Sequence, residues 1–345
     1  MPTVDQTQLR PFATSIFEAV GTPADTAVFV ADSLVDANLA GHDSHGVLRL
    51  PGYCESLNAG DIIPNAHASV IARDRATAVV DGALGWGQPA MRLAAETVVD
   101  LARECGLGGV VVRRCYHIGR AAPYVEHVAR AGMIGIAMSN AGPGVAPFGG
   151  RQRVLGTNPF AWSMPIGDEA DPLTFDIATA AIAEGKLRVA RAHNRSVSPN
   201  MLVDSHGQET LDPDDFFNGG AILPFGGHKG NGFSILAQML GRALAGMDTT
   251  GFDGPRGANG PVILAIDPTC FTTAAEFRSE VAAQTRLIAE STPAVGFDEV
   301  LLPGDLERRT LRDRAVNGIP IPETTWAELS DLASSLGVTM IEGGA

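Results

Sequence analysis

Residues 41–53 read GHDSHGVLRLPGY and hold two histidines, a carboxylate, a hydroxyl, an arginine and a tyrosine. A core segment cannot bury that many polar groups without partners. If the part from Ser44 to Arg49 forms a helical turn, His45 and Arg49 are four residues apart and project from one face. An imidazole exchanges protons near neutral pH, and a guanidinium binds a carboxylate with two hydrogen bonds. A 2-oxo or 2-hydroxy acid offers a target to each group, although the pattern also fits a helix C-terminus with solvated polar side chains.

The segment before residue 41 is expected to be helical. A first apolar row with helical spacing is followed by Gly21, which is a frequent helix stop. Thr22 and Pro23 then restart a helix, and a second apolar row leads into Gly41. The two rows are Leu9, Phe12, Ile16 and Val20, and Val28, Ala31, Val35 and Leu39.

The middle of the chain alternates strand and helix patterns, which indicates a mixed α/β fold. Strands are expected at 76–80, 108–112, 134–138, 160–164, 173–177 and 262–266, and helices at 88–104, 124–131, 306–316 and 325–336. Loops rich in glycine and proline are expected at 140–151 and 223–232, with a further loop at 252–260 as a subdomain hinge. Such loops bring the backbone close to a ligand or to another chain.

Composition narrows the class of protein. Of the 345 residues, 45% are hydrophobic and 19% charged, which is typical of a well-packed globular chain of two or three subdomains. The net charge of −14 argues against a nucleic-acid partner and against an anionic membrane. No apolar run is long enough to span a bilayer and no secretory signal is visible, so a cytoplasmic location is expected. The four cysteines form no C-x-x-C pair, which favours reduced thiols.

Several common motifs are absent from the sequence. No G-x-G-x-x-G follows a strand, so the usual Rossmann fingerprint is missing. There is no P-loop and no G-x-S-x-G nucleophile elbow. His42, Asp43 and His45 could be metal ligands, but they lack the H-E-x-x-H spacing and no second ligand cluster is evident.

Further candidates lie at strand ends and in glycine-rich turns. His117 and Arg120 follow the strand expected at 108–112, where α/β proteins often bind ligands. Asp176 ends another strand and could accept hydrogen bonds from a ribose or a carboxamide, or could instead start a helix at 178–183. Only two of the 25 basic residues are lysines, Lys186 and Lys229, and both lie beside glycine. An arginine-dominated chain can keep lysine where a compact ammonium is required.

The order of the motifs resembles the malate/L-lactate dehydrogenase family, which also contains ureidoglycolate, sulfolactate and Δ1-piperideine-2-carboxylate oxidoreductases. The resemblance covers about residues 5 to 338. Within the family, the motifs most resemble those of the bacterial hydroxycarboxylate dehydrogenases. This family is distinct from the Rossmann-type lactate and malate dehydrogenases, which explains the missing fingerprint. The motifs are GHDSHG at 41–46, YHIG at 116–119, GTNP at 156–159, FDIAT at 175–179, EGK at 184–186, GHKG at 227–230, PGD at 303–305 and GIPIP at 318–322.

The resemblance implies an α/β chain with a non-Rossmann nicotinamide-binding fold and a largely antiparallel central sheet, assembled as a homodimer. Helices from both chain ends, 1–73 plus 303–345, form one domain. Residues 74–182 plus 255–302 form the cofactor-binding sheet domain. A small helical domain spans 183–254.

The resemblance also implies the site residues. Ser44 and His45 match the catalytic pair, Arg49 the substrate-carboxylate arginine, and Tyr53 and Thr157 further substrate contacts. The segments that match cofactor-binding stretches are His117, Ile118, Gly119, Arg120 and Ala121; Asp176, Ile177 and Ala178; His228 and Lys229; and Gly304 and Asp305.

The expected activity is reversible hydride transfer between a nicotinamide cofactor and C2 of a small 2-hydroxy or 2-oxo carboxylic acid. NAD is slightly favoured over NADP, and no metal is required. The alternatives are reduction of a cyclic imino acid, a metal-dependent lyase or hydrolase built on His42, Asp43 and His45, and a non-catalytic dimer that binds small carboxylic acids. Many relatives have tyrosine where this chain has Asn231, and some have arginine in place of Gly52, which leaves the substrate open.

Overall fold

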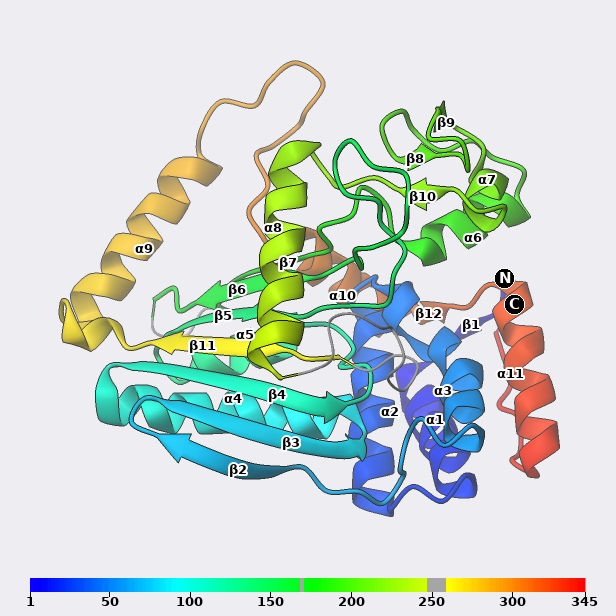
Figure 1. Cartoon of the computed structure of the whole chain (residues 1–345), viewed down its shortest axis with the longest axis horizontal. Helices are drawn as coiled ribbons and strands as arrows, with labels where there is room; N and C mark the ends of the chain where they lie inside the picture. The colour runs from blue at the N-terminus through cyan, green and yellow to red at the C-terminus, as the bar shows by residue number, and fades with distance from the viewer. Residues whose placement is uncertain (168–170, 247–258, 345) are drawn as a thin grey trace.

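A computed structural model describes residues 1–167, 171–246 and 259–344. Its centre is a seven-stranded sheet in the order β2-β3-β4-β11-β5-β6-β7 (Figure 1). Only the β3–β4 pair is parallel, so the expectation of a largely antiparallel sheet is confirmed. The strands are β2 (Ser69–Asp74), β3 (Thr77–Gly85), β4 (Leu107–Cys115), β11 (Val262–Ile266), β5 (Ile134–Met138), β6 (Phe160–Met164) and β7 (Leu173–Ile177).

Helices α4 (Gly87–Cys105) and α5 (Ala122–Arg130) pack against this sheet. Figure 1 shows α4 behind strands β3 and β4. The alternating apolar residues of β4, such as Val110 and Val112, are fully buried beneath it. A Cβ on Gly108 would lie 2.6 Å from the carbonyl oxygen of Val98, so glycine allows the close approach of helix and strand.

A second core forms where the two ends of the chain meet. Strand β1 (Thr3–Val4) pairs with β12 (Ile319–Pro320), and apolar residues such as Leu9, Leu34 and Leu329 share one buried cluster. The helices of both termini therefore pack together, as expected. They are α1 (Gln6–Ala19), α2 (Ala24–Leu39), α3 (Leu50–Asn58), α10 (Asp305–Asn317) and α11 (Glu323–Leu336).

The region expected to be a small helical domain contains strands as well as helices. Its sheet has the order β10-β8-β9, and its core includes Val145 and Leu155 from the preceding loop. The elements are α6 (Glu184–Ala192), β8 (Leu202–Val203), β9 (Glu209–Thr210), α7 (Pro213–Phe217) and β10 (Ala221–Ile222). Helix α8 (His228–Gln238) continues as a π-helical turn η3 (Met239–Leu244) and packs on the central sheet, with the Phe233 and Phe160 ring centroids 5.4 Å apart.

The remaining elements are short turns and one long helix: η1 (Asp43–His45), η2 (Val47–Arg49), η4 (Pro268–Cys270) and α9 (Ala274–Ala289). Of the hinge expected at 252–260, residues 252–258 lie outside the described residues. Within the described ranges, no helix combines the length and apolarity needed to cross a bilayer.

Candidate active site

The stretch 41–53 does not form one continuous helical turn. Turns η1 and η2 are separated at Gly46, whose backbone is extended at φ −90° and ψ −156°. A Cβ on Gly46 would overlap the side-chain amide of Asn38, and Asn38 Oδ1 accepts the backbone N–H of Val47 at 2.8 Å. The condition of one helical turn from Ser44 to Arg49 is therefore not met, because the side chain of buried Asn38 on α2 occupies the space beside Gly46.

The Ser44 and His45 side chains contact each other directly. Ser44 Oγ lies 3.0 Å from Nδ1 of His45. The other ring nitrogen of His45, Nε2, forms no hydrogen bond with any described residue. Nε2 is thus the atom of His45 that is available to a ligand.

Arg49 is tied back to the same turn, since its Nε donates to the carbonyl oxygen of Ser44 at 2.6 Å. Its two terminal nitrogens form no hydrogen bond within the described part of the chain. A guanidinium held at Nε presents its terminal nitrogens as a fork that matches a carboxylate. The broken turn therefore still places an imidazole and a guanidinium together.

His117 lies beside His45, with the two rings stacked at a centroid distance of 5.5 Å. The hydroxyl of Tyr53 lies 2.7 Å from Nδ1 of His117, and Gln88 Nε2 donates to that hydroxyl at 3.3 Å. Gly119 N–H also points to His117 Nδ1, at 3.4 Å. Tyr53 is only 2% exposed, so its hydroxyl is directed to His117 rather than to the surface.

Both histidine rings are held neutral by their surroundings. Burial lowers the pKa of His45 well below its usual range, and the nearby His117, Arg49, His42 and Arg120 lower it further. Burial, assisted by the charge of Arg49, lowers the pKa of His117 to about 3. A neutral imidazole can accept a proton, so at physiological pH His45 is suited to deprotonate a hydroxyl group.

Asp176 joins β7 to the segment that follows β4. Its Oδ2 accepts the backbone N–H groups of Ala121 at 3.0 Å and Ala122 at 2.8 Å, at the start of α5. A carboxylate is favourable at a helix N-terminus. No helix begins at 178–183, because α6 starts at Glu184, so the alternative role of Asp176 at a helix start there is wrong.

The segment from His117 to Ala121 is fixed by polar contacts on several sides. Asn259 Oδ1 accepts the N–H of Ile118 at 3.2 Å, and the Tyr124 hydroxyl donates to the Ile118 carbonyl oxygen at 2.6 Å. Gly119 has φ +72°, a conformation that glycine adopts at little cost. The backbone that follows His117 is therefore held in one conformation beside the two histidine rings.

Thr157 lies in a turn that contacts the small domain. Its carbonyl oxygen accepts Thr179 N–H at 2.8 Å and Thr179 Oγ1 at 3.1 Å. Its neighbour Asn158 is fully buried, and its Nδ2 donates to Gln238 Oε1 at 3.0 Å. The hydrogen bonds of Thr157 thus lead to Thr179, after β7, and not to the His45 cluster. The small domain reaches that cluster at Gly185, where a Cβ would lie 3.1 Å from Cβ of Ser44.

His228 and Lys229 are the first two residues of helix α8, so the expectation of a loop through residue 232 is wrong for this part. Gly226 and Gly227 before them both have positive φ, which turns the chain sharply into the helix. Both side chains are exposed. An exposed helix N-terminus with a lysine in its first turn suits a phosphate.

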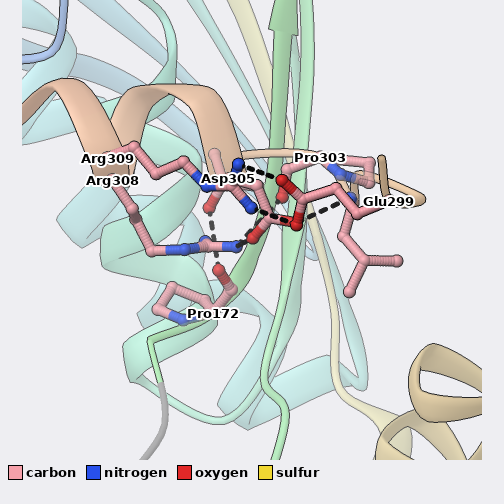
Figure 2. A network of polar contacts seen from close by, with 8 residues as sticks. Pro172, Glu299, Pro303, Asp305, Arg308 and Arg309 are labelled. Atoms are coloured by element: carbon pink, nitrogen blue, oxygen red, sulfur yellow. Dashed lines mark hydrogen bonds and ion pairs between the residues drawn. The ribbon is translucent and has the colours of Figure 1, made fainter. Parts of the chain in front are cut away.

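Gly304 and Asp305 begin α10 next to β7. Gly304 has φ +87°, and a Cβ there would lie 3.2 Å from the carbonyl oxygen of Thr174. Asp305 accepts Leu302 N–H at 2.7 Å and pairs with Arg308 at 2.8 Å. Figure 2 shows this network, in which Arg309 pairs with Glu299. Here the segment expected to bind cofactor is surrounded by paired charges.

The three residues of the metal alternative are directed to other partners. His42 Nε2 lies 3.2 Å from Glu307 Oε1, and Asp43 forms an ion pair with Arg314 at 2.6 Å. Across the described ranges, no group of three or more His, Cys, Asp or Glu side chains is placed to hold a metal ion. The geometry gives this alternative no support.

Comparison with known proteins identifies the family of this chain. The family model described as malate/L-lactate dehydrogenase matches residues 4–330. The chain belongs to this family. It is 36% identical over 330 residues to an L-sulfolactate dehydrogenase of Methanocaldococcus jannaschii, with 94% of each chain covered. It is 35% identical to hydroxycarboxylate dehydrogenase B of Escherichia coli O157:H7, covering 97% of this chain and 94% of that one.

A solved structure gives the same fold. The Δ1-piperideine-2-carboxylate reductase of Pseudomonas syringae has a TM-score of 0.85 and 31% identity, and covers 96% of this chain and 100% of its own. This member of the malate/L-lactate dehydrogenase family is thus an oxidoreductase that transfers a hydride between a nicotinamide cofactor and a 2-hydroxy or 2-oxo acid.

The residues around His117 fit such a cofactor. Three polar atoms here are buried without a hydrogen-bond partner among the described residues: Arg120 Nε, Gln88 Oε1 and Asn140 Nδ2. Buried polar groups nearly always have hydrogen-bond partners. Unpaired polar atoms beside residues 117–121 therefore indicate that a polar ligand completes the site. The amides and hydroxyls of a nicotinamide nucleotide provide such partners.

Several residues of the dehydrogenase site escaped the sequence analysis. Gln88 donates to the Tyr53 hydroxyl from 35 residues away in the sequence. Asn259 accepts from the Ile118 N–H from 141 residues away. Asn38 and Arg314 shape the turn at 41–46. The one usable signal was Asn38, a polar residue that continues the buried apolar row of Ala31 and Leu34 along α2.

Proposed function

We propose that His45 is the acid/base of the reaction and that Ser44 orients it. The observation that carries this assignment is the 3.0 Å contact between Ser44 Oγ and His45 Nδ1, while Nε2 forms no hydrogen bond with a described residue. With Nδ1–H donating to Ser44 Oγ, Nε2 carries a lone pair and takes the proton from the substrate hydroxyl during oxidation. In reduction the protonated ring returns that proton to the developing alkoxide.

Arg49 binds the substrate carboxylate through its two terminal nitrogens. Its bond to the Ser44 carbonyl oxygen holds carboxylate recognition and proton transfer in a fixed relation. Thr157 contributes a further substrate contact through its hydroxyl, since its hydrogen bonds to described residues involve only its carbonyl oxygen. Tyr53 acts on the site by holding His117 through its hydroxyl, rather than by contacting the substrate itself.

When bound, the nicotinamide cofactor supplies or accepts the hydride at C2 of the substrate. Residues 117–121 and 176–178 line its position, and His228 and Lys229 bind its phosphates at the start of α8. Gly304 and Asp305 complete the contact. NAD is slightly favoured over NADP, because Arg308 and Arg309 beside Gly304 and Asp305 are paired with carboxylates and offer no free cation to a 2′-phosphate at this point.

The substrate is a small 2-hydroxy or 2-oxo carboxylic acid. The enzyme is a cytoplasmic homodimer. Each subunit has three domains, at 1–73 plus 303–345, 74–182 plus 255–302, and 183–254. The exposed apolar side chains of α8 and η3 support dimerisation, since Phe233, Met239 and Leu244 are 43%, 52% and 58% exposed. Light scattering of the purified chain measures the oligomeric state directly, and a monomer at micromolar concentration contradicts the proposed homodimer.

The decisive experiment follows nicotinamide absorbance with a panel of 2-oxo acids, with NADH and NADPH, with and without a chelator. Turnover that the chelator leaves unchanged supports the proposal. Turnover lost to the chelator supports a metal enzyme, and binding without turnover supports a carboxylate-binding protein. Δ1-Piperideine-2-carboxylate belongs in the panel because of the reductase of the same fold. Its preference over every oxo acid identifies an imino-acid reductase.

A further inference from the structure

Helix α10 presents one row of side chains to the turn that carries Ser44 and His45. Glu307, Thr310 and Arg314 are three and four residues apart, which places them on one face of the helix. Glu307 Oε1 lies 3.2 Å from His42 Nε2. Thr310 lies under Gly41, where a Cβ would come within 3.0 Å of its methyl group.

The third member of this row makes the strongest contact. Arg314 donates to Asp43 Oδ1 at 2.6 Å and to Asp43 Oδ2 at 3.1 Å, a two-bond ion pair. Its side chain is only 14% exposed. Asn38 Nδ2 also donates to Asp43 Oδ1 at 2.7 Å, and Arg314 donates to the Asn38 carbonyl oxygen. Asp43 is therefore held on two sides, by α10 and by α2.

These contacts lie immediately before the two residues of the proposed catalytic pair. The backbone N–H of His45 donates to the His42 carbonyl oxygen at 2.8 Å, and that of Gly46 to the Asp43 carbonyl oxygen at 3.0 Å. The Ser44 carbonyl oxygen in turn holds Arg49. A displacement of Asp43 would thus move both the imidazole and the guanidinium.

We propose that Asp43 and Arg314 are positioning residues, through which α10 holds the turn bearing His45 and Arg49 in place for proton transfer. The inference rests on the proposed roles of His45 and Arg49. The same helix begins at Gly304 and Asp305, about 15 Å away along its axis. It therefore joins the proposed cofactor segment and the acid/base turn as one rigid body.

Asp43→Asn, Arg314→Gln and the double variant test this role. Each single change should lower kcat between about 10- and 100-fold, since small displacements of catalytic groups cost that much. The cofactor Kd, measured by nicotinamide fluorescence, should stay within twofold. The double variant should be no worse than the poorer single variant, because the two residues act as one unit. Arg314→Lys keeps the charge but not the fork, and should retain intermediate kcat.

Asp32→Asn is the matched control. Asp32 also lies on the helical domain, pairs with Arg10 at 2.8 Å and is 41% exposed, against 38% for Asp43, but it does not touch the turn. Its kcat should equal that of the wild type. In Asp43→Asn, the acid limb of hydroxy-acid oxidation should also shift from its wild-type pH, because the variant changes both the packing of the turn and the charge two residues from His45. The control should show no such shift.

Assays run well below each variant's Tm separate positioning from unfolding. The proposal is overturned if Asp43→Asn matches Asp32→Asn in kcat and pH profile, or if the two losses add in the double variant. If Asp43→Asn does not fold, Arg314→Lys is the test instead. A wild-type kcat in Arg314→Lys also overturns the proposal. Wild-type kcat in His45→Ala would instead remove the acid/base assignment, which is a separate outcome.

Discussion

The hydroxyl of Tyr53 lies 2.7 Å from Nδ1 of His117, and Gln88 donates to the same hydroxyl from α4. A phenol that accepts from an amide directs its own proton to the imidazole, so His117 accepts at Nδ1 and is neutral. Burial lowers the pKa of His117 to about 3 in agreement with this arrangement. The site thus contains an uncharged ring stacked on His45.

Stability should fall as the pH is lowered from about 6.5 toward 3. In this window the unfolded chain protonates His117 while the folded chain does not, so the unfolded state binds more protons. The free energy of unfolding should decrease by up to about 1.4 kcal/mol per pH unit for this histidine. Urea unfolding at pH 7, 6, 5 and 4 measures the slope. His117→Gln should flatten it, and an equal slope in that variant would assign the effect to other groups.

The two directions of catalysis should depend on pH in opposite ways. Burial and neighbouring positive charge lower the pKa of His45, so the free enzyme keeps the base form well below pH 6.5. Oxidation, followed as kcat/KM, should therefore stay constant to a lower pH than an ordinary histidine allows. Reduction needs the protonated ring and should rise continuously as the pH falls. A plateau of reduction across pH 5 to 8 would contradict this assignment.

His45→Ala should lower kcat by roughly 100-fold or more, because the variant loses the group that exchanges the substrate proton. Cofactor affinity should remain nearly unchanged, since Nε2 faces the substrate in the proposed mechanism. Steady-state kinetics and fluorescence titration measure the two quantities. His206→Ala, an exposed histidine of the small domain, is the control and should behave like the wild type. Near-wild-type kcat in His45→Ala would mean that another group transfers the proton.

Arg49→Lys should reduce kcat/KM strongly although it keeps the charge, because lysine cannot reproduce the fork held at Nε by Ser44. The loss should be much smaller for a substrate whose carboxylate is replaced by an amide. Comparing the two substrates in both enzymes isolates the carboxylate contact. Equal losses on both substrates would show that Arg49 supports the turn rather than the ligand.

The central sheet was largely predictable because its signal is local. Strands β5, β6, β7 and β11 have the bounds expected from short apolar runs between turn residues. The broken turn at Gly46 was not predictable, because it depends on the side chain of Asn38 from the preceding helix. Neither was the start of α8, since the glycines before Lys229 read as a loop.

The polar contacts that organise the site come from distant parts of the chain. His42 pairs with Glu307 and Asp43 with Arg314, across separations of 265 and 271 residues. Charges on an exposed helix such as α10 have no pattern that names their partners. Motifs thus located the candidate residues, while the folded chain decides which of them meet.

Lys229 should contribute to cofactor binding and not to substrate binding. It is the second residue of α8, where the backbone N–H groups of His228 and Lys229 form no hydrogen bond with a described residue and can attract an anion. Gly226 and Gly227 at positive φ turn the chain so that a phosphate can approach this end. The exposed ammonium then adds a point charge to the backbone donors.

Lys229→Ala should therefore raise the Kd of the nicotinamide cofactor. Loss of one charge-assisted contact costs about 1.5–3 kcal/mol, which is about a 10- to 150-fold change in Kd. Substrate KM at saturating cofactor should change far less. Arg130→Ala removes a cation from an exposed pair with Glu126 on α5 and should leave the cofactor Kd unchanged. Fluorescence titration compares the two variants. An unchanged cofactor Kd in Lys229→Ala, together with weaker substrate binding, would reassign the lysine to the substrate.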